Sequence, residues 1–362
     1  MKILTVVGAR PQFIKAAPVS RQIRKKHQEV LLHTGQHFDD NMSDVFFREM
    51  GIPKPDYNLG MSGGTHAQMT GKMMIGIEEV LEAEKPDWLL VYGDTNSTLA
   101  AALAAAKLHV PICHVEAGCR THRMTNPEEI NRVCTDHISS LLLMSTRGAI
   151  EELEKEGLKE KSVFVGDPMY DAFIEYKDCL SVSDLEVRGL DGKKETIPSS
   201  FNYLTCHREE NTFDDSALNE IFKAMDVQDI PTIYPVHPRN KERALRLVKK
   251  NNYRNIILIE PVGYLESICL VSNSNKVVTD SGGVQREAFF AGKKCVTVLD
   301  FVSWPETMVC GRNTLSKPYA SDIEQKLKIQ QKVDSSYMPF GDGKSAERIV
   351  KELETHSNEI YL

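Results

Sequence analysis

Three acidic residues in the first half of the chain could carry acid–base chemistry. Asp94 and Glu116 each end a short apolar run, and Glu128 follows Pro127 at the apparent start of a helix. If the apolar runs are neighbouring parallel strands, these carboxyl groups gather at one edge of the sheet. Carboxylates that share a site compete for protons, which raises the pKa of at least one of them. The grouping therefore predicts a site that holds both an acid and a base.

Each of these residues also fits another role. Asp94 could cap the helix that follows it, and Glu128 and Glu129 fit a first helical turn, where carboxylates complement the helix dipole. His114, Glu116 and Asp94 could instead bind a metal. Their spacing is not that of a dense ligand motif, so we predict no metal site.

A basic segment follows the first apolar run of the chain. In GARPQFIK (residues 8–15), Gly8 permits a sharp turn, and Arg10 and Lys15 flank a helix start. A phosphate is favoured at such a position. An ordinary strand–helix turn with solvated cations is the alternative interpretation.

A glycine turn follows a later apolar run. The segment TDSGGVQRE (279–287) places Ser281, Gly282 and Gly283 before a helix. The backbone N–H groups of such a turn suit a pyrophosphate. Glu287, one helical turn further on, could accept hydrogen bonds from a ribose diol.

Two histidine–arginine pairs also follow apolar runs in the second half. His207 precedes Arg208, and His237 lies two residues before Arg239. In parallel sheets the ends of strands face the ligand, so both pairs are candidates for the same site.

Short apolar runs alternate with helical patterns along nearly the whole chain. This alternation is typical of parallel sheets built from β–α–β units. Strands are expected at 2–7, 29–33, 88–92, 112–115, 141–144 and 162–165, and then at 202–205, 232–234, 255–259, 276–279 and 294–299. Helices are expected at 13–24, 70–83, 98–107, 128–139, 149–156, 216–225, 241–249, 263–271, 284–291 and 344–353. We therefore predict an α/β protein with two doubly wound domains in tandem.

The chain has 362 residues, which suits two hydrophobic cores. The polar stretch 181–200 has little periodicity, and we place the domain linker in it or just before it. The expected domains are 1–175, which carries the carboxylates, and 200–338, which carries the glycine turn. Residues 339–362 hold the last helix.

Composition excludes several classes of protein. The net charge of −7 argues against a nucleic-acid partner. No run approaches ~18 apolar residues, and the N-terminus does not resemble a signal peptide. Eight cysteines without a C-x-x-C pair indicate reduced, mostly buried thiols. We therefore expect a cytoplasmic protein with no membrane partner.

Together these motifs resemble the non-hydrolysing UDP-N-acetylglucosamine 2-epimerase family. The matching segments occur in the right order and cover nearly the whole chain. They are GARPQFIK (8–15), TGQHFD (34–39), GDTNSTLA (93–100), HVEAGCR (114–120), PEEINR (127–132), HRE (207–209), PVHP (235–238), EPVGYLE (260–266), TDSGGVQREA (279–288) and PFGDGKSAERI (339–349).

The resemblance implies a GT-B type fold, in which two Rossmann-like domains face a cleft and the last helix packs back on the first domain. It also implies a homodimer. The implied reaction is reversible C2 epimerisation of UDP-N-acetylglucosamine to UDP-N-acetylmannosamine, a precursor of surface polysaccharide. UDP leaves by anti elimination, a 2-acetamidoglucal intermediate stays bound, and UDP then adds back. The resemblance implies no metal and no nicotinamide cofactor.

Roles carried over from the family fall on residues already singled out. Asp94, Glu116 and Glu128 match its catalytic carboxylates, and His207 matches its catalytic histidine. Which of them removes the C2 proton is left open. The positions that hold UDP correspond to Arg10, Lys15, Ser281, Gly282, Gly283 and Glu287, with Arg132 and His237 nearby.

One departure bears on the substrate. The family often has an arginine before a late Pro-Glu pair, where this chain has Trp304. A related branch acts on UDP-2,3-diacetamido-2,3-dideoxyglucuronic acid, which is therefore an alternative substrate. A GT-B glycosyltransferase, a hydrolysing 2-epimerase and a non-catalytic sugar-nucleotide sensor are further alternatives. The carboxylates of the first domain argue against a transferase, and their presence together with His207 argues against a sensor.

Overall fold

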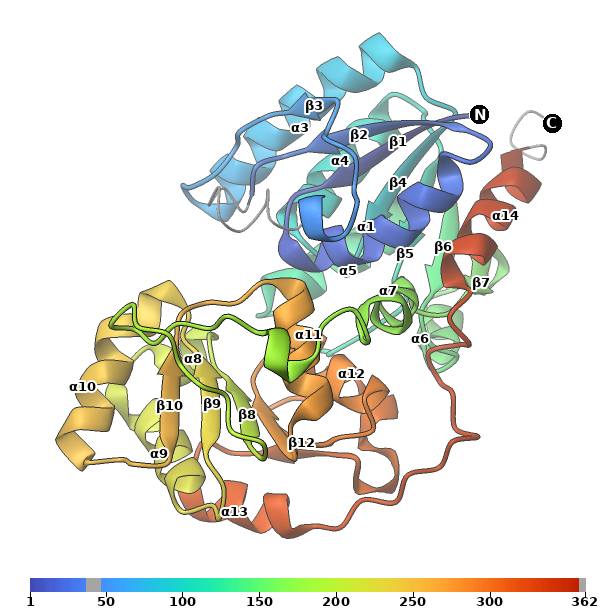
Figure 1. Cartoon of the computed structure of the whole chain (residues 1–362). Coiled ribbons are helices and arrows are strands. Elements are labelled where there is room, and N and C mark those ends of the chain that lie inside the picture. Colours follow the sequence, from blue (N-terminus) through green and yellow to red (C-terminus); the bar gives the residue numbers. More distant parts are fainter. Residues whose placement is uncertain (37–46, 358–362) are drawn as a thin grey trace. The chain divides into compact units, whose positions relative to one another are not determined.

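The computed structural model describes residues 1–36 and 47–357 (Figure 1). Contacts between residues divide the chain into two compact units. Unit 1 comprises Met1–Ile174 together with Met338–Leu362, and unit 2 comprises Glu175–Tyr337. The C-terminal helix therefore belongs to the same unit as the N-terminus.

Unit 1 is built on a parallel seven-stranded sheet. Its strand order is β3 (Tyr57–Asn58), β2 (Gln28–His33), β1 (Lys2–Val7), β4 (Trp88–Tyr92), β5 (Ile112–Val115), β6 (Leu141–Met144) and β7 (Ser162–Phe164). The order reverses between β1 and β4, so the loops after these two strands diverge there. Such a switch point is where open α/β sheets bind ligands.

Helices cover the sheet because most of its strands are apolar on both faces. The helices of unit 1 are α1 (Arg10–Ile23), α3 (His66–Glu84), α4 (Asn96–Lys107), α5 (Pro127–Ile138), α6 (Ala149–Lys155), α7 (Pro168–Tyr176), in which the division from unit 2 falls, and α14 (Ser345–Ser357). The alanine-rich α4 packs closely on α3, and together they bury one face of β1, β2 and β4.

The last helix packs back on the first domain, as predicted, and its contact there is with the first helix. Figure 1 shows α14 (red) beside α1 (blue), and the two helices are in contact. Two hydrogen bonds fix the ends of α14. The Ala346 backbone N–H donates to Asp171 over 2.8 Å, and the Trp88 indole N–H donates to the Ser357 hydroxyl over 2.7 Å.

Unit 2 repeats the doubly wound plan with six parallel strands. Their order is β10 (Ile256–Ile259), β9 (Thr232–Pro235), β8 (Asn202–Thr205), β11 (Lys276–Thr279), β12 (Lys294–Val298) and β13 (Asn313–Ser316). Its helices are α8 (Glu209–Thr212), α9 (Asp215–Asp226), α10 (Lys241–Asn251), α11 (Tyr264–Asn273), α12 (Gly282–Phe290) and α13 (Ala320–Lys328). The order reverses between β8 and β11, which places the loops after both strands at the switch point.

The polar stretch 181–200 is part of unit 2. Its Leu185 and Val187 side chains are buried and pack with Phe201 and Ile259. The Arg188 carbonyl accepts a hydrogen bond from the Glu260 backbone N–H over 2.8 Å.

The expected strands and helices all occur, with ends that differ by a few residues. Six strands match their predicted ranges residue for residue: β1, β4, β5, β6, β8 and β11. The prediction missed β3, which has two residues, and β13, whose sequence NTLS is polar. It also missed α7, α8 and α13. The Asn313 side chain accepts a hydrogen bond from Thr297 over 3.0 Å, so β13 is stabilised by buried polar pairing that an apolar pattern cannot indicate.

The cysteine prediction was only partly right. All eight cysteines are free thiols, but Cys134, Cys179 and Cys310 are exposed. No helix in the described part of the chain is both long and apolar enough to cross a membrane.

The β1–α1 turn is tightly packed around Gly8. A Cβ at Gly8 would lie 2.2 Å from the hydroxyl oxygens of Ser97 and Thr34, which hydrogen bond to each other over 2.8 Å. We expect Gly8→Ala to lower the free energy of unfolding by about 1–3 kcal/mol because overpacking must displace this pair.

Gly71 in α3 has open space around its Cβ position. Gly71→Ala should therefore raise the free energy of unfolding by about 0.5–1 kcal/mol. Urea unfolding measures both, and an unchanged Gly8→Ala midpoint would contradict the packing argument.

Candidate functional site

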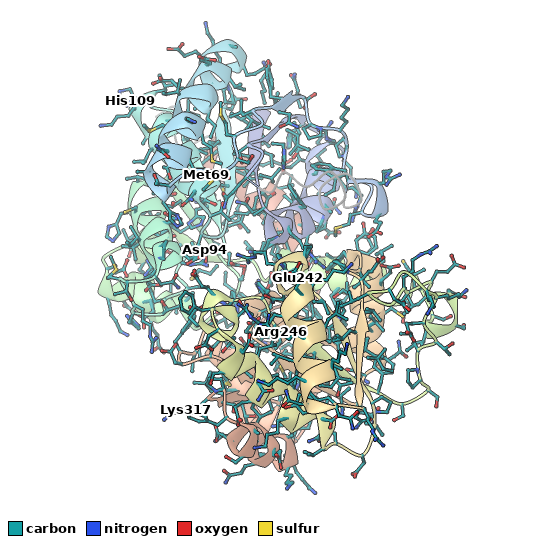
Figure 2. The ribbon with its side chains drawn as sticks, turned by 90° about the vertical axis from the view of Figure 1, so that its left-hand side faces the viewer. Met69, Asp94, His109, Glu242, Arg246 and Lys317 are labelled. Atoms are coloured by element: carbon teal, nitrogen blue, oxygen red, sulfur yellow. The ribbon has the colours of Figure 1, made fainter. Side chains whose placement is uncertain are left out.

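The carboxyl edge of the unit 1 sheet carries a cluster of four charged side chains. Asp94 lies in the loop after β4, and Glu116 directly follows β5. Lys15 comes from α1, and Arg132 comes from α5. The predicted grouping of Asp94 with Glu116 therefore occurs, and two cations lie between and beside them. Figure 2 labels Asp94 in this unit.

Lys15 forms a buried ion pair with Glu116. The Lys15 Nζ lies 2.5 Å from the Glu116 Oε2, and the two side chains are 3% and 4% exposed. Gly93 lies against this pair, because a Cβ there would be 3.4 Å from both the Glu116 Oε1 and the Lys15 Nζ. Its φ of +64° also favours glycine. The Lys15 charge is thus directed at a carboxylate.

Arg132 joins the two strand-end loops. Its Nη2 donates to the Asp94 Oδ2 over 2.5 Å and lies 3.4 Å from the Glu116 Oε1. Its Nη1 donates to the Glu116 backbone carbonyl. Burial opposes the charged guanidinium, but the negative charges of Asp94 and Glu116 outweigh burial and raise the pKa of Arg132 above its ordinary value.

Glu116 has a strained backbone. Its φ is +71°, a left-handed conformation that residues with a Cβ rarely adopt. The Glu116 N–H donates to the Leu143 carbonyl over 2.9 Å, while Arg132 binds the Glu116 carbonyl. These bonds hold the residue in the conformation that turns its carboxylate toward Lys15. Strain of this kind clusters at functional sites.

Glu128 differs from the other two predicted carboxylates. It is exposed in the first turn of α5, capped by Asn126, whose side chain accepts from the Glu128 N–H over 3.4 Å. Its neighbour Glu129 is buried instead and accepts from the Thr121 N–H over 2.9 Å and from the His122 N–H over 2.8 Å. The helix therefore directs Glu129 into the loop and Glu128 away from it.

Arg10, the first residue of α1, is half-buried.

Two neighbours of the cluster were not predicted. The Asn131 side-chain amide donates to the Asp94 carbonyl over 2.9 Å and to the Asn96 Oδ1 over 3.2 Å. The Gln36 Oε1 accepts from the Ser97 hydroxyl over 2.8 Å. Both lie in motifs that the sequence singled out, but the sequence does not show whether an amide bonds within a site or to water. The motif TGQHFD continues through 37–39, which lie outside the described residues.

Within residues 1–36 and 47–357, no group of three or more His, Cys, Asp and Glu side chains is placed to hold a metal ion. The alternative of a metal bound by His114, Glu116 and Asp94 therefore has no geometric support there.

In unit 2 the loop after β8 is organised by Asp280, which follows β11. The Asp280 carboxylate accepts from the backbone N–H groups of His207 and Arg208 at 2.9 Å each, and lies 3.1 Å from the His207 Nδ1. Burial alone would raise the pKa of Asp280, but the hydrogen bond and charge of His207, with the two backbone donors, lower it. Asp280 thus orients the His207 ring and leaves Nε2 for a ligand.

The predicted histidines of unit 2 lie together. The rings of His207 and His237 stack with 6.4 Å between their centroids. The His237 Nδ1 accepts from the Arg239 N–H over 3.3 Å. The Arg208 guanidinium lies 5.3 Å from the Phe301 ring centroid, a distance at which a cation and an aromatic face attract.

The glycine turn forms the start of α12, as predicted. Ser281 is the N-cap, and its hydroxyl accepts from the Val284 N–H over 3.4 Å. Gly282 and Gly283 are the first two helical residues, so their N–H groups lack partners within the helix. Glu287 is buried one turn further on.

Trp304 lies beneath this turn. Its side chain is buried, and the Arg286 guanidinium stacks 4.0 Å from its ring centroid. A Cβ at Gly282 would lie 3.3 Å from the Trp304 Nε1. Trp304 therefore packs under the turn, and a Cβ at position 282 would fit only if the indole shifted by a few tenths of an ångström.

The role of Asp280 predicts a pH-dependent stability. Its folded pKa is depressed, so its contribution is present above the unfolded value of about 3.9 and is lost as the pH falls through the folded pKa. Asp280→Asn should destabilise the protein by about 1–3 kcal/mol at pH 7, because buried donors lose an acceptor. The difference from wild type should shrink below pH 4. Urea unfolding from pH 7 to pH 3 measures it, and a constant difference would contradict this account.

Comparisons with known proteins find similar sequences over nearly the whole chain. A family model described as UDP-N-acetylglucosamine 2-epimerase matches residues 21–354. A Pseudomonas aeruginosa protein named UDP-2,3-diacetamido-2,3-dideoxy-D-glucuronate 2-epimerase is 46% identical over 98% of this chain and 99% of its own. A Methanocaldococcus jannaschii UDP-N-acetylglucosamine 2-epimerase is 39% identical, again over 98% and 99%.

A solved structure gives the same result for the fold. The crystal structure of the M. jannaschii UDP-GlcNAc 2-epimerase in complex with UDP-GlcNAc and UDP has a TM-score of 0.87 at 38% identity, and covers 98% of this chain and 100% of its own. The predicted α/β fold of two Rossmann-like sheets, of GT-B type, is therefore confirmed.

Proposed function

Because this chain belongs to the UDP-N-acetylglucosamine 2-epimerase family, we propose that it interconverts UDP-N-acetylglucosamine and UDP-N-acetylmannosamine. Family membership makes the protein an isomerase. The observation that carries the proposal is the cluster of partly exposed Asp94 with buried Lys15, Glu116 and Arg132 at the carboxyl edge of the unit 1 sheet. A chain that only bound the nucleotide would have no need of carboxylates held under strain beside two cations.

The chemistry follows from the weak acidity of the C2 proton. Direct removal of that proton would be very slow, so we propose that the C1–O bond breaks first or together with it. The bond's electron pair leaves with UDP, the C2 proton passes to a base, and a C1–C2 double bond forms in the bound 2-acetamidoglucal. Reprotonation on the opposite face and return of UDP give the epimer. Nearby carboxylates stabilise the positive charge that develops at C1.

The two clustered carboxylates are suited to different parts of this reaction. Asp94 keeps 32% of its side chain exposed, and one of its oxygens is held by Arg132. Glu116 is 4% exposed and is paired with Lys15. We therefore assign proton transfer at C2 to Asp94 and charge stabilisation to Glu116. Glu128, exposed in α5, stays a proposed third carboxylate.

Recognition of UDP is assigned to residues of both units. We propose that the N-terminus of α12, at Ser281, Gly282 and Gly283, binds the diphosphate, as helix N-termini bind anions. Glu287 then takes the ribose, with His207 acting on the departing phosphate oxygen beside His237. Arg10 is proposed as a further phosphate contact, and Lys15 and Arg132 act through the carboxylates that they bind. The reaction needs no metal or nicotinamide.

A second substrate is favoured by a specific observation. The 46% identical Pseudomonas aeruginosa relative is named for UDP-2,3-diacetamido-2,3-dideoxy-D-glucuronate, and Trp304 departs from the arginine common in the family. C2 epimerisation of that uronate is therefore the alternative. A homodimer, a cytoplasmic location and a role in supplying surface polysaccharide remain proposals from the family resemblance.

Proton NMR in D₂O tests the reaction directly. With UDP-N-acetylglucosamine and no added metal or acceptor, we expect deuterium at C2 and the signals of UDP-N-acetylmannosamine. If that sugar is inert but the diacetamido-uronate exchanges, the second substrate is correct. Release of free N-acetylmannosamine would indicate a hydrolysing enzyme, and inertness of both nucleotides would contradict the proposal.

Substitutions test the carboxylates one at a time. Asp94→Asn, Glu116→Gln and Glu128→Gln should each lower kcat by roughly 10²–10⁴-fold, the range for loss of an acid–base group, while UDP binding by calorimetry persists. Glu160→Gln changes an exposed carboxylate in unit 1 and serves as the control. Near-normal turnover in any of the three variants removes that residue from the mechanism.

A further inference from the structure

His114, the last but one residue of β5, lies between two hydrogen-bond acceptors in the core of unit 1. Its Nδ1 is 2.7 Å from the Asp136 Oδ1, and its Nε2 is 2.7 Å from the Gly93 carbonyl oxygen. The side chains of His114 and Asp136 are both fully buried. A carbonyl oxygen cannot donate a hydrogen bond, so the Nε2 must carry a proton.

The Nδ1 of His114 must also carry a proton as long as Asp136 is ionised. Asp136 accepts from the Gly118 backbone N–H over 3.1 Å, and its Oδ2 lies 2.7 Å from the Arg120 guanidinium. The Arg120 guanidinium and the Gly118 N–H can only donate, so they favour an ionised Asp136 whatever the state of His114. An ionised Asp136 only accepts, so the Nδ1 of His114 also donates.

The charges around His114 fit a cationic ring. Arg120 also binds Glu156, to whose carboxylate it donates two hydrogen bonds of 2.8 Å each. With a positive His114, the charges of His114, Asp136, Arg120 and Glu156 alternate in sign from the sheet to the surface. The Lys161 ammonium approaches from the other side and donates to the Asp136 backbone carbonyl over 3.2 Å.

We propose that His114 carries a proton on both ring nitrogens and positions Asp94 by holding the Gly93 carbonyl. The inference rests on the proposed function of Asp94. Gly93 is fixed from both sides, because its N–H donates to the Val115 carbonyl over 3.0 Å while its carbonyl accepts from His114. The peptide that leads to Asp94 therefore cannot rotate without breaking the bond to His114. His114 is a positioning residue, and Asp94 is the group that meets the substrate.

Histidine-selective ¹⁵N NMR of the wild-type protein tests the protonation state without any substrate. We expect both ring nitrogens of His114 to have imidazolium shifts and directly bonded protons at pH 8, in a resonance identified by its contacts with the Gly93–Asp94 peptide. A nitrogen without a proton at pH 7.5 would overturn the proposal.

Two substitutions separate the two hydrogen bonds. In His114→Gln the amide can reach the Gly93 carbonyl, whereas in His114→Asn it is long enough only for Asp136. We expect kcat to fall about 10- to 100-fold more in His114→Asn than in His114→Gln, with KM within about threefold, since misplacement of a catalytic group acts on turnover. The exposed His109, at the opposite end of α4 from Asp94 (Figure 2), supplies the control His109→Asn.

The outcomes separate this proposal from the function on which it rests. Equal kcat values in the two His114 variants would contradict the positioning role even if the ring is charged. An inert wild-type protein would instead contradict the proposed reaction, and the NMR result would still decide the state of His114.

Discussion

A guanidinium buried away from water must be surrounded by acceptors, and in unit 1 this requirement falls on Arg132. Its partners are the carboxylates of Asp94 and Glu116 and the Glu116 carbonyl, which come from loops after two neighbouring strands. Because one side chain binds both loops, their relative positions are fixed. The left-handed backbone of Glu116 persists within this set of bonds, and Lys15 adds a second cation on the same carboxylate. The charged cluster of unit 1 is arranged around this pairing.

The same topology appears in unit 2 with a different use of charge. Asp94 follows β4 and Asp280 follows β11, and each of these strands adjoins the first strand of its own sheet. In unit 1 the aspartate stays partly exposed and is bound by Arg132. In unit 2 it is buried and holds the loop that carries His207. One position in the fold therefore holds a partly exposed aspartate in one sheet and a buried, supporting aspartate in the other.

Because the cations of unit 1 are paired with carboxylates, less of their positive charge is left for an anionic ligand. Lys15 and Arg132 were expected to contact the nucleotide, but the structure directs both to Glu116, with Arg132 also on Asp94. Their charge is largely offset within unit 1. The chain as a whole has a net charge of −7, and the N-terminus of α12 at Ser281 carries the partial positive charge of a helix dipole.

The sequence by itself determined the alternation of strands and helices and the placement of Asp94, Glu116 and the α12 turn after strands. It did so because apolar periodicity is local, and because the carboxyl ends of parallel strands share one edge. It could not determine which side of α5 faces the cluster, so Glu128 and Glu129 could not be told apart. Nor could it pair His114 with Asp136 or His207 with Asp280, or detect the polar strand β13. Those outcomes depend on contacts between residues far apart in the chain, where burial and the need to satisfy buried charges select the partners, and only the tertiary structure decides them.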